Sequence, residues 1–242
     1  MEAVTFTSPD YIKIKPFGSD TWISSETLGI YVDLPSVPPF SQQRVSVANV
    51  GLDCDISVRD DVWEDISISI PALSFYSKDD FDFSPVYAFI ANAELLEISR
   101  FPDYYFKVRS VNAVAPSAQY GGDKIRFTFR FTCKPFKYLK DNDYIEFNGE
   151  TITNPGTRFC RPIYHITGTT GTVLTVNGSA FTIADTDGTN FYIDCERLLA
   201  YFADGTNILP KTSGQFPFLQ PGINNVDLSD GEMTVKLNAR CY

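Results

Sequence analysis

Apolar and polar residues alternate along several short stretches of this chain. The clearest stretch runs from Ile125 to Cys133, where every second residue is apolar. Successive side chains of a β-strand point to opposite faces, so this pattern predicts a strand with one buried and one solvent-facing side. Isoleucines and serines alternate in the same way from Ile66 to Ile70, and residues 104–111 are predicted to form a third strand. The buried side of the first strand is expected to carry Ile125, Phe127, Phe129, Phe131 and Cys133.

Pairs of turn-forming residues separate many of the apolar runs. Asparagine, aspartate and glycine tolerate the positive φ angles of tight turns, so such pairs between apolar runs predict β-hairpins. The clearest predicted hairpin is residues 172–183, which have an Asn-Gly pair at their centre. The four pairs are Gly121-Gly122, Asn148-Gly149, Asn177-Gly178 and Asp230-Gly231.

One helix is predicted. Ser84 can cap its start, Pro85 suits its first position, and Val86–Ala93 would continue it for about two turns. Residues 94–98 could extend this helix or begin a strand. A strand is favoured, because Pro102-Asp103 then makes a hairpin turn that leads into the next strand.

Together these elements predict an all-β fold with one short helix. The strong strand is expected to end at Pro135, and the segment after it is dense in hairpin signals and poor in helix signals. We therefore place a domain boundary near Asp141, which divides the chain into residues 1–140 and residues 141–242.

The composition favours a folded protein and limits what it binds. Of the 242 residues, 43% are hydrophobic and 14% aromatic, which is sufficient for a packed core. The net charge of −10 argues against binding nucleic-acid phosphates over a broad surface, and it leaves room for one local basic patch. No apolar run is long enough to span a bilayer, and residues 1–10 lack the pattern of a secretory signal. We therefore expect synthesis in a cytoplasm and no membrane partner.

Cysteine and histidine give no sign of a reactive or metal-binding centre. The five cysteines are scattered and contain no Cys-x-x-Cys pair, so neither a zinc site nor a disulfide framework is predicted. His165 is the only histidine, and a Ser-His-Asp or Cys-His mechanism would have to use it. No Gly-x-Ser-x-Gly turn accompanies it, so we expect an ordinary strand residue.

Two groups of carboxylates were weighed as metal sites. Asp185, Asp187 and Glu196 match the first, third and twelfth positions of a calcium-binding loop, but Asn190 stands where that loop needs glycine. A hairpin turn at Asp187-Gly188 is the simpler interpretation. The run Asp79, Asp80 and Asp82 is interpreted as a solvated loop that leads into the helix.

Two further groups were weighed as a glycosidase site and a nucleic-acid site. Glu64 and Asp65 are adjacent, and adjacent strand residues point to opposite faces, so they do not predict a catalytic pair. Lysines alternate with aromatic residues from Lys134 to Lys140, which is typical of single-strand binding. That span is short and the chain is acidic. We therefore favour a structural elbow between the two domains as the role of the segment that contains Lys134, Lys137 and Lys140. We therefore predict no catalytic residue, no cofactor and no metal.

A series of motifs in the first half resembles the distal tail (Dit) proteins of long-tailed phages that infect Gram-positive bacteria. In this chain the series starts with a glycine-containing segment before a strand (Val47–Ile70). At Asn49, Leu52 and Cys54 this segment differs from the residues that are commoner in the family. A short helix, a strand, a Pro-Asp turn and a Tyr-Tyr strand follow. The half closes on the motif Cys133-Lys134-Pro135-Phe136-Lys137-Tyr138.

The second half continues the resemblance, which covers roughly residues 30–242. Asn154, Gly156, Thr157 and Pro162 match one family motif, and residues 173–183 match the strand pair around an Asn-Gly turn. Residues 192–196 and 214–224 match the last two motifs. Each motif is degenerate alone, whereas their order and spacing together are fairly specific.

The resemblance implies a structural protein and not an enzyme. It implies a ring-forming first domain and a galectin-like β-sandwich as the second domain. Family members form hexameric rings, single or stacked, at the tail tip of the virion. These rings join the tail tube protein to the tail-associated hub or lysin protein, and DNA passes through the channel without specific binding. Some relatives hold receptor-binding proteins through long insertions, for which residues 141–242 leave no room.

The channel wall is expected to carry net negative charge, because a basic wall would bind the passing phosphates. The acidic segments Asp53–Asp65 and Asp79–Asp82 are the candidates for that wall. The alternative function is a carbohydrate-binding module of a cell-wall adhesin that uses the second sandwich. Both tryptophans, Trp22 and Trp63, lie in the first half, so the second domain lacks a tryptophan platform for sugar. A wall-degrading enzyme would need a catalytic constellation that the sequence does not contain.

Overall fold

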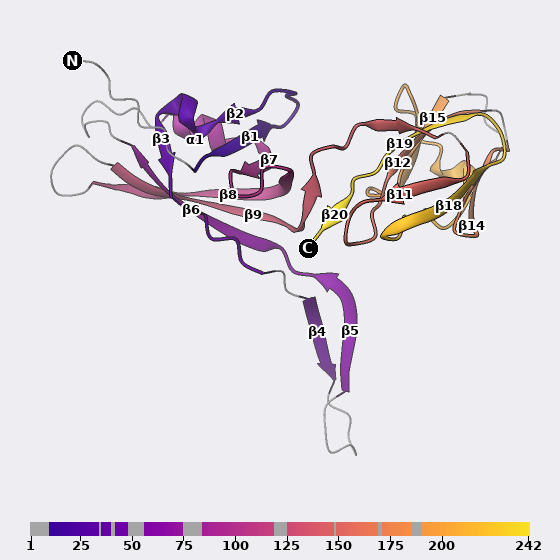
Figure 1. The fold of residues 1–242 in the computed structure, drawn as a ribbon, viewed down its shortest axis with the longest axis horizontal. Helices are drawn as coiled ribbons and strands as arrows, with labels where there is room; N and C mark the ends of the chain where they lie inside the picture. The colour runs from indigo at the N-terminus through magenta and orange to yellow at the C-terminus, as the bar shows by residue number, and fades with distance from the viewer. Residues whose placement is uncertain are drawn as a thin grey trace. The chain divides into compact units, whose positions relative to one another are not determined.

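The structure is a computed structural model that describes residues 10–33, 35–39, 42–47, 56–74, 84–118, 125–147, 149–168, 171–184 and 190–242. The chain divides into two compact units, residues 1–137 and residues 138–242 (Figure 1). Strands dominate both units, and the described residues contain one α-helix, so the predicted all-β class with a short helix is confirmed. Separate folding of two domains remains a prediction.

The first unit is built around one large antiparallel sheet. Its strand order is β2-β1-β7-β8-β9-β6-β3 (Figure 1). A two-stranded ribbon of β4 (Gln42–Val47) and β5 (Ile56–Trp63) forms a separate sheet. A 3-10 helix, η1 (Ser25–Leu28), precedes β3. The strands of the large sheet are β1 (Ile12–Pro16), β2 (Ile23–Ser24), β3 (Ile30–Val32), β6 (Ile66–Ser74), β7 (Ala93–Ile98), β8 (Tyr104–Ala118) and β9 (Ile125–Leu139).

The core of the first unit lies on one face of this sheet. Ile70 of β6 stands opposite Phe129 of β9, and Ile68 stands opposite Phe131. The alternation therefore gives the two strands a shared apolar face, and the predicted inward residues of β9 are all buried. The helix α1 (Ser84–Ala91) covers this core with three buried side chains, Val86, Phe89 and Ile90.

The segment after the helix is a strand, as favoured by the sequence. β7 begins at Ala93 and continues to Ile98, and a turn over residues 99–103 leads into β8. The prediction that the strong strand ends at Pro135 was wrong, because β9 continues to Leu139. Pairing with β6 stops at Cys133. Proline lacks an N–H group, and it is tolerated here because β6 no longer pairs with the strand at that position.

The second unit is a β-sandwich of two five-stranded sheets. One sheet has the order β10-β19-β12-β15-β16, and the other has the order β11-β18-β13-β14-β17. The first sheet contains β10 (Tyr144–Glu146), β19 (Glu232–Lys236), β12 (Ile163–Thr167), β15 (Asn190–Asp194) and β16 (Leu199–Phe202). The second contains β11 (Thr151–Asn154), β18 (Gly222–Leu228), β13 (Val173–Val176), β14 (Ser179–Ile183) and β17 (Thr212–Gly214), which follows the 3-10 helix η2 (Leu209–Lys211).

The sandwich core lies between these sheets. Its largest fully buried side chains are Tyr164, Phe181 and Phe191. The last strand is β20 (Arg240–Cys241), and next to it the N–H of Leu139 donates to the carbonyl of Ala239 (3.1 Å). A galectin-like identity of the sandwich remains a prediction.

Two of the predicted hairpin turns are confirmed. Asn177 and Gly178 connect β13 to β14 with φ angles of 49° and 82°, which is the positive-φ geometry that such a turn requires. Residues 229–231 connect β18 to β19, and Gly231 has a φ of 91°. The Gly121-Gly122 pair and Asn148 lie outside the described residues. In the part of the chain that the structure describes, no helix is long and apolar enough to cross a membrane.

Candidate functional site

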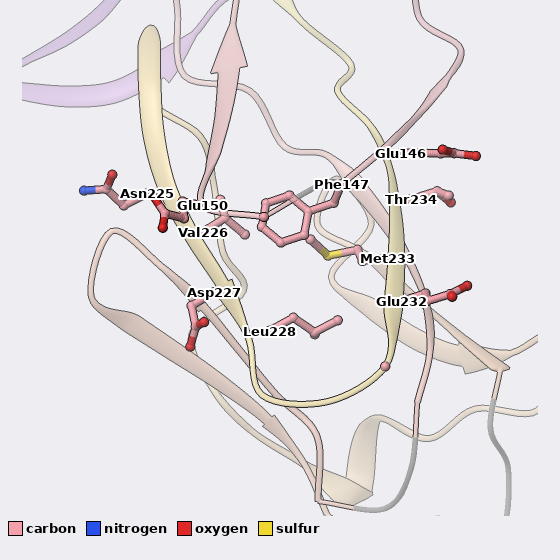
Figure 2. A pocket seen from close by; sticks show the side chains of 12 residues that line it. Glu146, Phe147, Glu150, Asn225, Val226, Asp227, Leu228, Glu232, Met233 and Thr234 are labelled. Carbon is pink, nitrogen blue, oxygen red and sulfur yellow. The ribbon is translucent and has the colours of Figure 1, made fainter.

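A groove of about 860 Å³ opens at one edge of the second unit, where the two sheets of the sandwich separate (Figure 2). Its two sides are β18, with residues 225–228, and β19, with residues 231–234. One end is formed by residues 146–147 and 149–150, at the crossing from β10 in one sheet to β11 in the other. The groove is therefore framed by two connections between the sheets.

The floor of the groove is apolar. Val226 and Met233 are each 3% exposed and belong to the sandwich core, while Phe147 and Leu228 are half-buried and pack against that core. Figure 2 shows the side chains of Phe147, Met233 and Leu228 toward the middle of the groove. Val226, Leu228 and Met233 point inward because their strands alternate inner and outer residues. The groove thus opens directly onto the hydrophobic core.

The lips of the groove are acidic. Glu146 and Glu232 lie on the side of one sheet, and Glu150 and Asp227 lie on the side of the other (Figure 2). All four carboxylates are exposed, and no lysine or arginine is among the lining residues. Asp227 and Glu232 alternate with the inward residues, and Figure 2 shows Glu146 and Glu232 pointing away from the middle of the groove. The carboxylates therefore flank an apolar floor on both sides without entering it.

Backbone hydrogen bonds hold the frame of the groove. The N–H of Phe147 donates to the carbonyl of Met233 (3.0 Å), and the N–H of Val226 donates to the carbonyl of Glu150 (2.9 Å). These bonds join the β10–β11 crossing to β19 and to β18. Both walls are consequently fixed to the same short segment.

His165 lies in β12, as predicted, on the outer face of its sheet. Its Nδ1 is 3.3 Å from the hydroxyl of Thr234, and its Nε2 is 2.6 Å from the amide oxygen of Asn190. Its ring stacks on Tyr192 at 4.4 Å, and Tyr192 stacks in turn on Tyr201 at 5.4 Å. An amide and a hydroxyl on the two ring nitrogens suit an imidazole that holds neighbouring strands.

The two carboxylate groups that were weighed and set aside as metal sites lie only partly within the described residues. Asp185, Asp187 and the run from Asp79 to Asp82 lie outside them. Glu196 lies in the turn after β15, where its N–H donates to the carboxylate of Asp194 (3.0 Å). Within the described ranges, no three histidine, cysteine, aspartate or glutamate side chains gather in a way that could hold a metal.

The remaining candidate residues have structural contacts. Glu64 and Asp65 lie in the link between β5 and β6, so their expected position in a strand was wrong, and Asp65 pairs with Arg109 (3.1 Å). Lys137 lies over the rings of Phe101 (4.9 Å) and Tyr104 (5.4 Å). Cations on aromatic faces are stabilising, so Lys137 contributes to packing within the first unit.

The described cysteines are buried thiols. Cys133, Cys160, Cys195 and Cys241 are all free and buried. Burial raises the pKa of Cys133 and of Cys160 from 9.0 to about 12, because the thiolate loses its hydration. Both thiols are therefore protonated at neutral pH, in the unreactive form.

Comparisons with known proteins identify the fold. No protein-family model matches the chain, and no curated protein sequence matches it. The crystal structure of the Dit protein of phage SPP1 matches with a TM-score of 0.67 and 14% identity, over 93% of this chain and 97% of that chain. It is described as a paradigm of the hub adsorption apparatus in Gram-positive-infecting phages.

Two structures of the phage p2 baseplate in its activated conformation are more distant. The structure with strontium has a TM-score of 0.48 at 10% identity, and that with calcium has 0.49 at 11%. They cover 94% and 95% of this chain, and 97% and 98% of the matched chains. The SPP1 similarity is sufficient by itself: the chain has the Dit fold over nearly its whole length, which confirms the predicted resemblance at the level of the fold.

Proposed function

We propose, for a chain that has the Dit fold throughout, that it is a structural hub protein at the tip of a phage tail. The observation that carries this proposal is that the fold match spans both units and almost all of the SPP1 Dit chain. A match to one unit alone would support only a shared domain. A match of both units in the same order supports a shared architecture, and with it a shared structural role.

The proposed protein forms a hexameric ring through its first unit. A large sheet with exposed end strands is prone to pair with other chains, and closing a ring covers such edges. β2 and β3 are the end strands of the large sheet. Phe17, in the turn after β1, is 79% exposed, which is unusual for a large apolar side chain and supports a contact between subunits.

The proposed ring connects the tail tube protein to the tail-associated hub or lysin protein, and it lets DNA pass without specific binding. It is proposed to be an adaptor without catalytic activity. Of the acidic segments suggested for the channel wall, Asp79–Asp82 and residues 53–55 lie outside the described residues. A net negative bore therefore remains a prediction.

The alternative, a carbohydrate-binding adhesin module, is less well supported. The aromatic row of His165, Tyr192 and Tyr201 stacks ring on ring, with interplanar angles of 16° and 14°. A sugar stacks on a ring face that is open to solvent, and in this row the rings cover one another. Trp63 packs edge-on against Phe136 in the first unit.

The full chain tests the proposal directly. Light scattering after size exclusion should give about six times the monomer mass of 27.1 kDa, and negative-stain images should show rings with a central channel. A chain that remains monomeric at high concentration would refute the ring.

A matched pair of variants tests which unit makes the contacts. Phe17→Asp should break the ring, whereas Ile223→Asp, at a similarly exposed position (74%) in the second unit, should leave it intact. The opposite result would assign the ring contacts to the second unit.

A further inference from the structure

The groove in the second unit is open because its walls extend beyond the strands that flank them. β10 ends its pairing with β19 at Glu146 and Thr234, and β11 begins its pairing with β18 at Thr151 and Asn225. Residues 226–228 and 232–233 continue past these points. On the side away from the groove, residues 226–228 of β18 pair with β13, and residues 232–233 of β19 pair with β12. The core is therefore uncovered at one edge between two well-supported walls.

The far end of the groove is a tightly packed turn. A Cβ added to Gly231 would lie 2.2 Å from the carbonyl oxygen of Thr167 and 2.7 Å from the Cα of Gly168. The β18–β19 turn therefore lies directly against the end of β12, and the groove is formed before any ligand arrives. A preformed site binds with little ordering cost.

The size of the groove suits inserted side chains. Packed sheets are separated by about 10 Å, which leaves room for side chains from an added chain between the two walls. The volume of about 860 Å³ lies within the usual range for binding pockets, which is roughly 300–1,000 Å³. Covering the half-buried Phe147 and Leu228 would remove apolar surface from water, which is favourable.

The charge on the lips selects the occupant. In the described part of the chain, no lysine, arginine or histidine pairs with the carboxylates of Glu146, Glu150, Asp227 or Glu232. Like charges on both sides repel an acidic ligand and attract a basic one, and complementary charge governs specificity more than affinity. Nucleic acid, with its phosphates, is therefore disfavoured, and an apolar segment with basic flanks fits both features.

We propose that this groove binds an extended segment of a partner protein, which inserts apolar side chains between the sheets and places lysine or arginine against both lips. The site lies wholly within the second unit, so the proposal stands whether or not the chain forms a ring.

The chain offers a specific reporter for this site. It contains two methionines, Met1 and Met233, and Met233 lies in the floor of the groove. Methyl-labelled methionine in the full chain should give two NMR signals, of which one reports the groove and the other serves as an internal control. The probe is the peptide Lys-Lys-Val-Leu-Val-Leu-Lys-Lys, and its matched control carries glutamate in place of every lysine.

The lysine peptide should shift the Met233 signal in a saturable way and leave Met1 unchanged, and the glutamate peptide should shift neither. The double variant Glu146→Lys with Glu232→Lys should raise the Kd at low salt at least tenfold. The double variant Glu94→Lys with Asp103→Lys changes the net charge equally, at exposed positions of the first unit, and should raise the Kd less than about twofold.

Four results would overturn the proposal. They are equal weakening by both double variants, binding that leaves Met233 unshifted, equal binding of the two peptides, and no shift at millimolar peptide. A Met233 signal that moves with protein concentration alone would instead place a second copy of this chain in the groove, which also contradicts the proposal.

Discussion

Asn142, near the start of the second unit, and Asn238, near its end, are 96 positions apart and form hydrogen bonds with each other. The amide of Asn142 donates to the side-chain oxygen of Asn238 (3.0 Å), and the backbone N–H of Asn238 donates to the side-chain oxygen of Asn142 (2.7 Å). Both side chains are buried. Asn238 has a φ of 50°, a left-handed conformation that asparagine adopts more readily than most residues.

Replacing Asn238 by alanine should therefore destabilise the second unit by roughly 2–4 kcal/mol, because Asn142 loses a buried partner and alanine is strained at that φ. Denaturant melting measures the free energy of unfolding. Asn225→Ala, at an exposed position of β18, is the control and should change it by less than about 0.5 kcal/mol. Equal effects of the two variants would contradict this role.

Phe129 should be one of the most sensitive core positions of the first unit. It is 1% exposed and contacts the rings of Phe127 (5.1 Å) and Phe131 (6.4 Å) edge-on. Phe129→Ala should cost roughly 3–5 kcal/mol of unfolding free energy, because a large cavity remains. Arg130→Ala, on the exposed face of the same strand, should cost about 0.5 kcal/mol or less. A loss under about 1 kcal/mol at Phe129 would contradict the packing.

His165 should matter for stability and not for assembly. Replacing it by alanine removes the stack on Tyr192 and should cost about 0.5–1.5 kcal/mol beyond the lost burial. Thermal melting and particle assembly are measured together, and assembly should be unchanged. A variant that melts normally and fails to assemble would point to a functional histidine.

The buried thiols should be unreactive in the native chain. The Cys54→Ser variant leaves only the four described cysteines to react. In this variant, Ellman's reagent at pH 8 should react with no thiol before denaturation and with four after it. Fast reaction of a native thiol would show that the burial of at least one of them is wrong.

The same thiols predict a loss of stability at high pH. The pKa of Cys133 and of Cys160 is about 12 in the folded chain and returns to 9.0 on unfolding. The unfolded state therefore releases these protons first as pH rises, so the stabilisation is complete below pH 9 and is lost progressively between pH 9 and 12. Melting of wild type and of Cys133→Ala across this range should show a steeper decline for wild type.

Much of the fold could be predicted from local sequence. The alternation around Phe129 specifies which face of β9 is buried, and Asn177-Gly178 specifies a hairpin, because both depend only on neighbouring residues. Pro135 was misread because its tolerance depends on where β6 stops pairing, which is a contact between distant segments.

The groove could not be predicted from sequence for the same reason. Met233 and Val226 have the pattern of ordinary core residues in alternating strands. Only the lengths of β10 and β11 open the edge of the sandwich beside them, and those lengths follow from the tertiary pairing. Acidic residues that alternate with apolar ones, as at Glu232 and Met233, are too common to indicate a groove alone.

The frame of the groove makes recognition conditional on folding. Its walls and its ends come from segments near both ends of the second unit, residues 146–147 and 149–150 and residues 225–234, and they meet only after both sheets have formed. A ligand that recognises this frame has no binding site on an incompletely folded chain, so it stabilises the native state by mass action. Docking at this position would thus distinguish a folded second unit from an incompletely folded one.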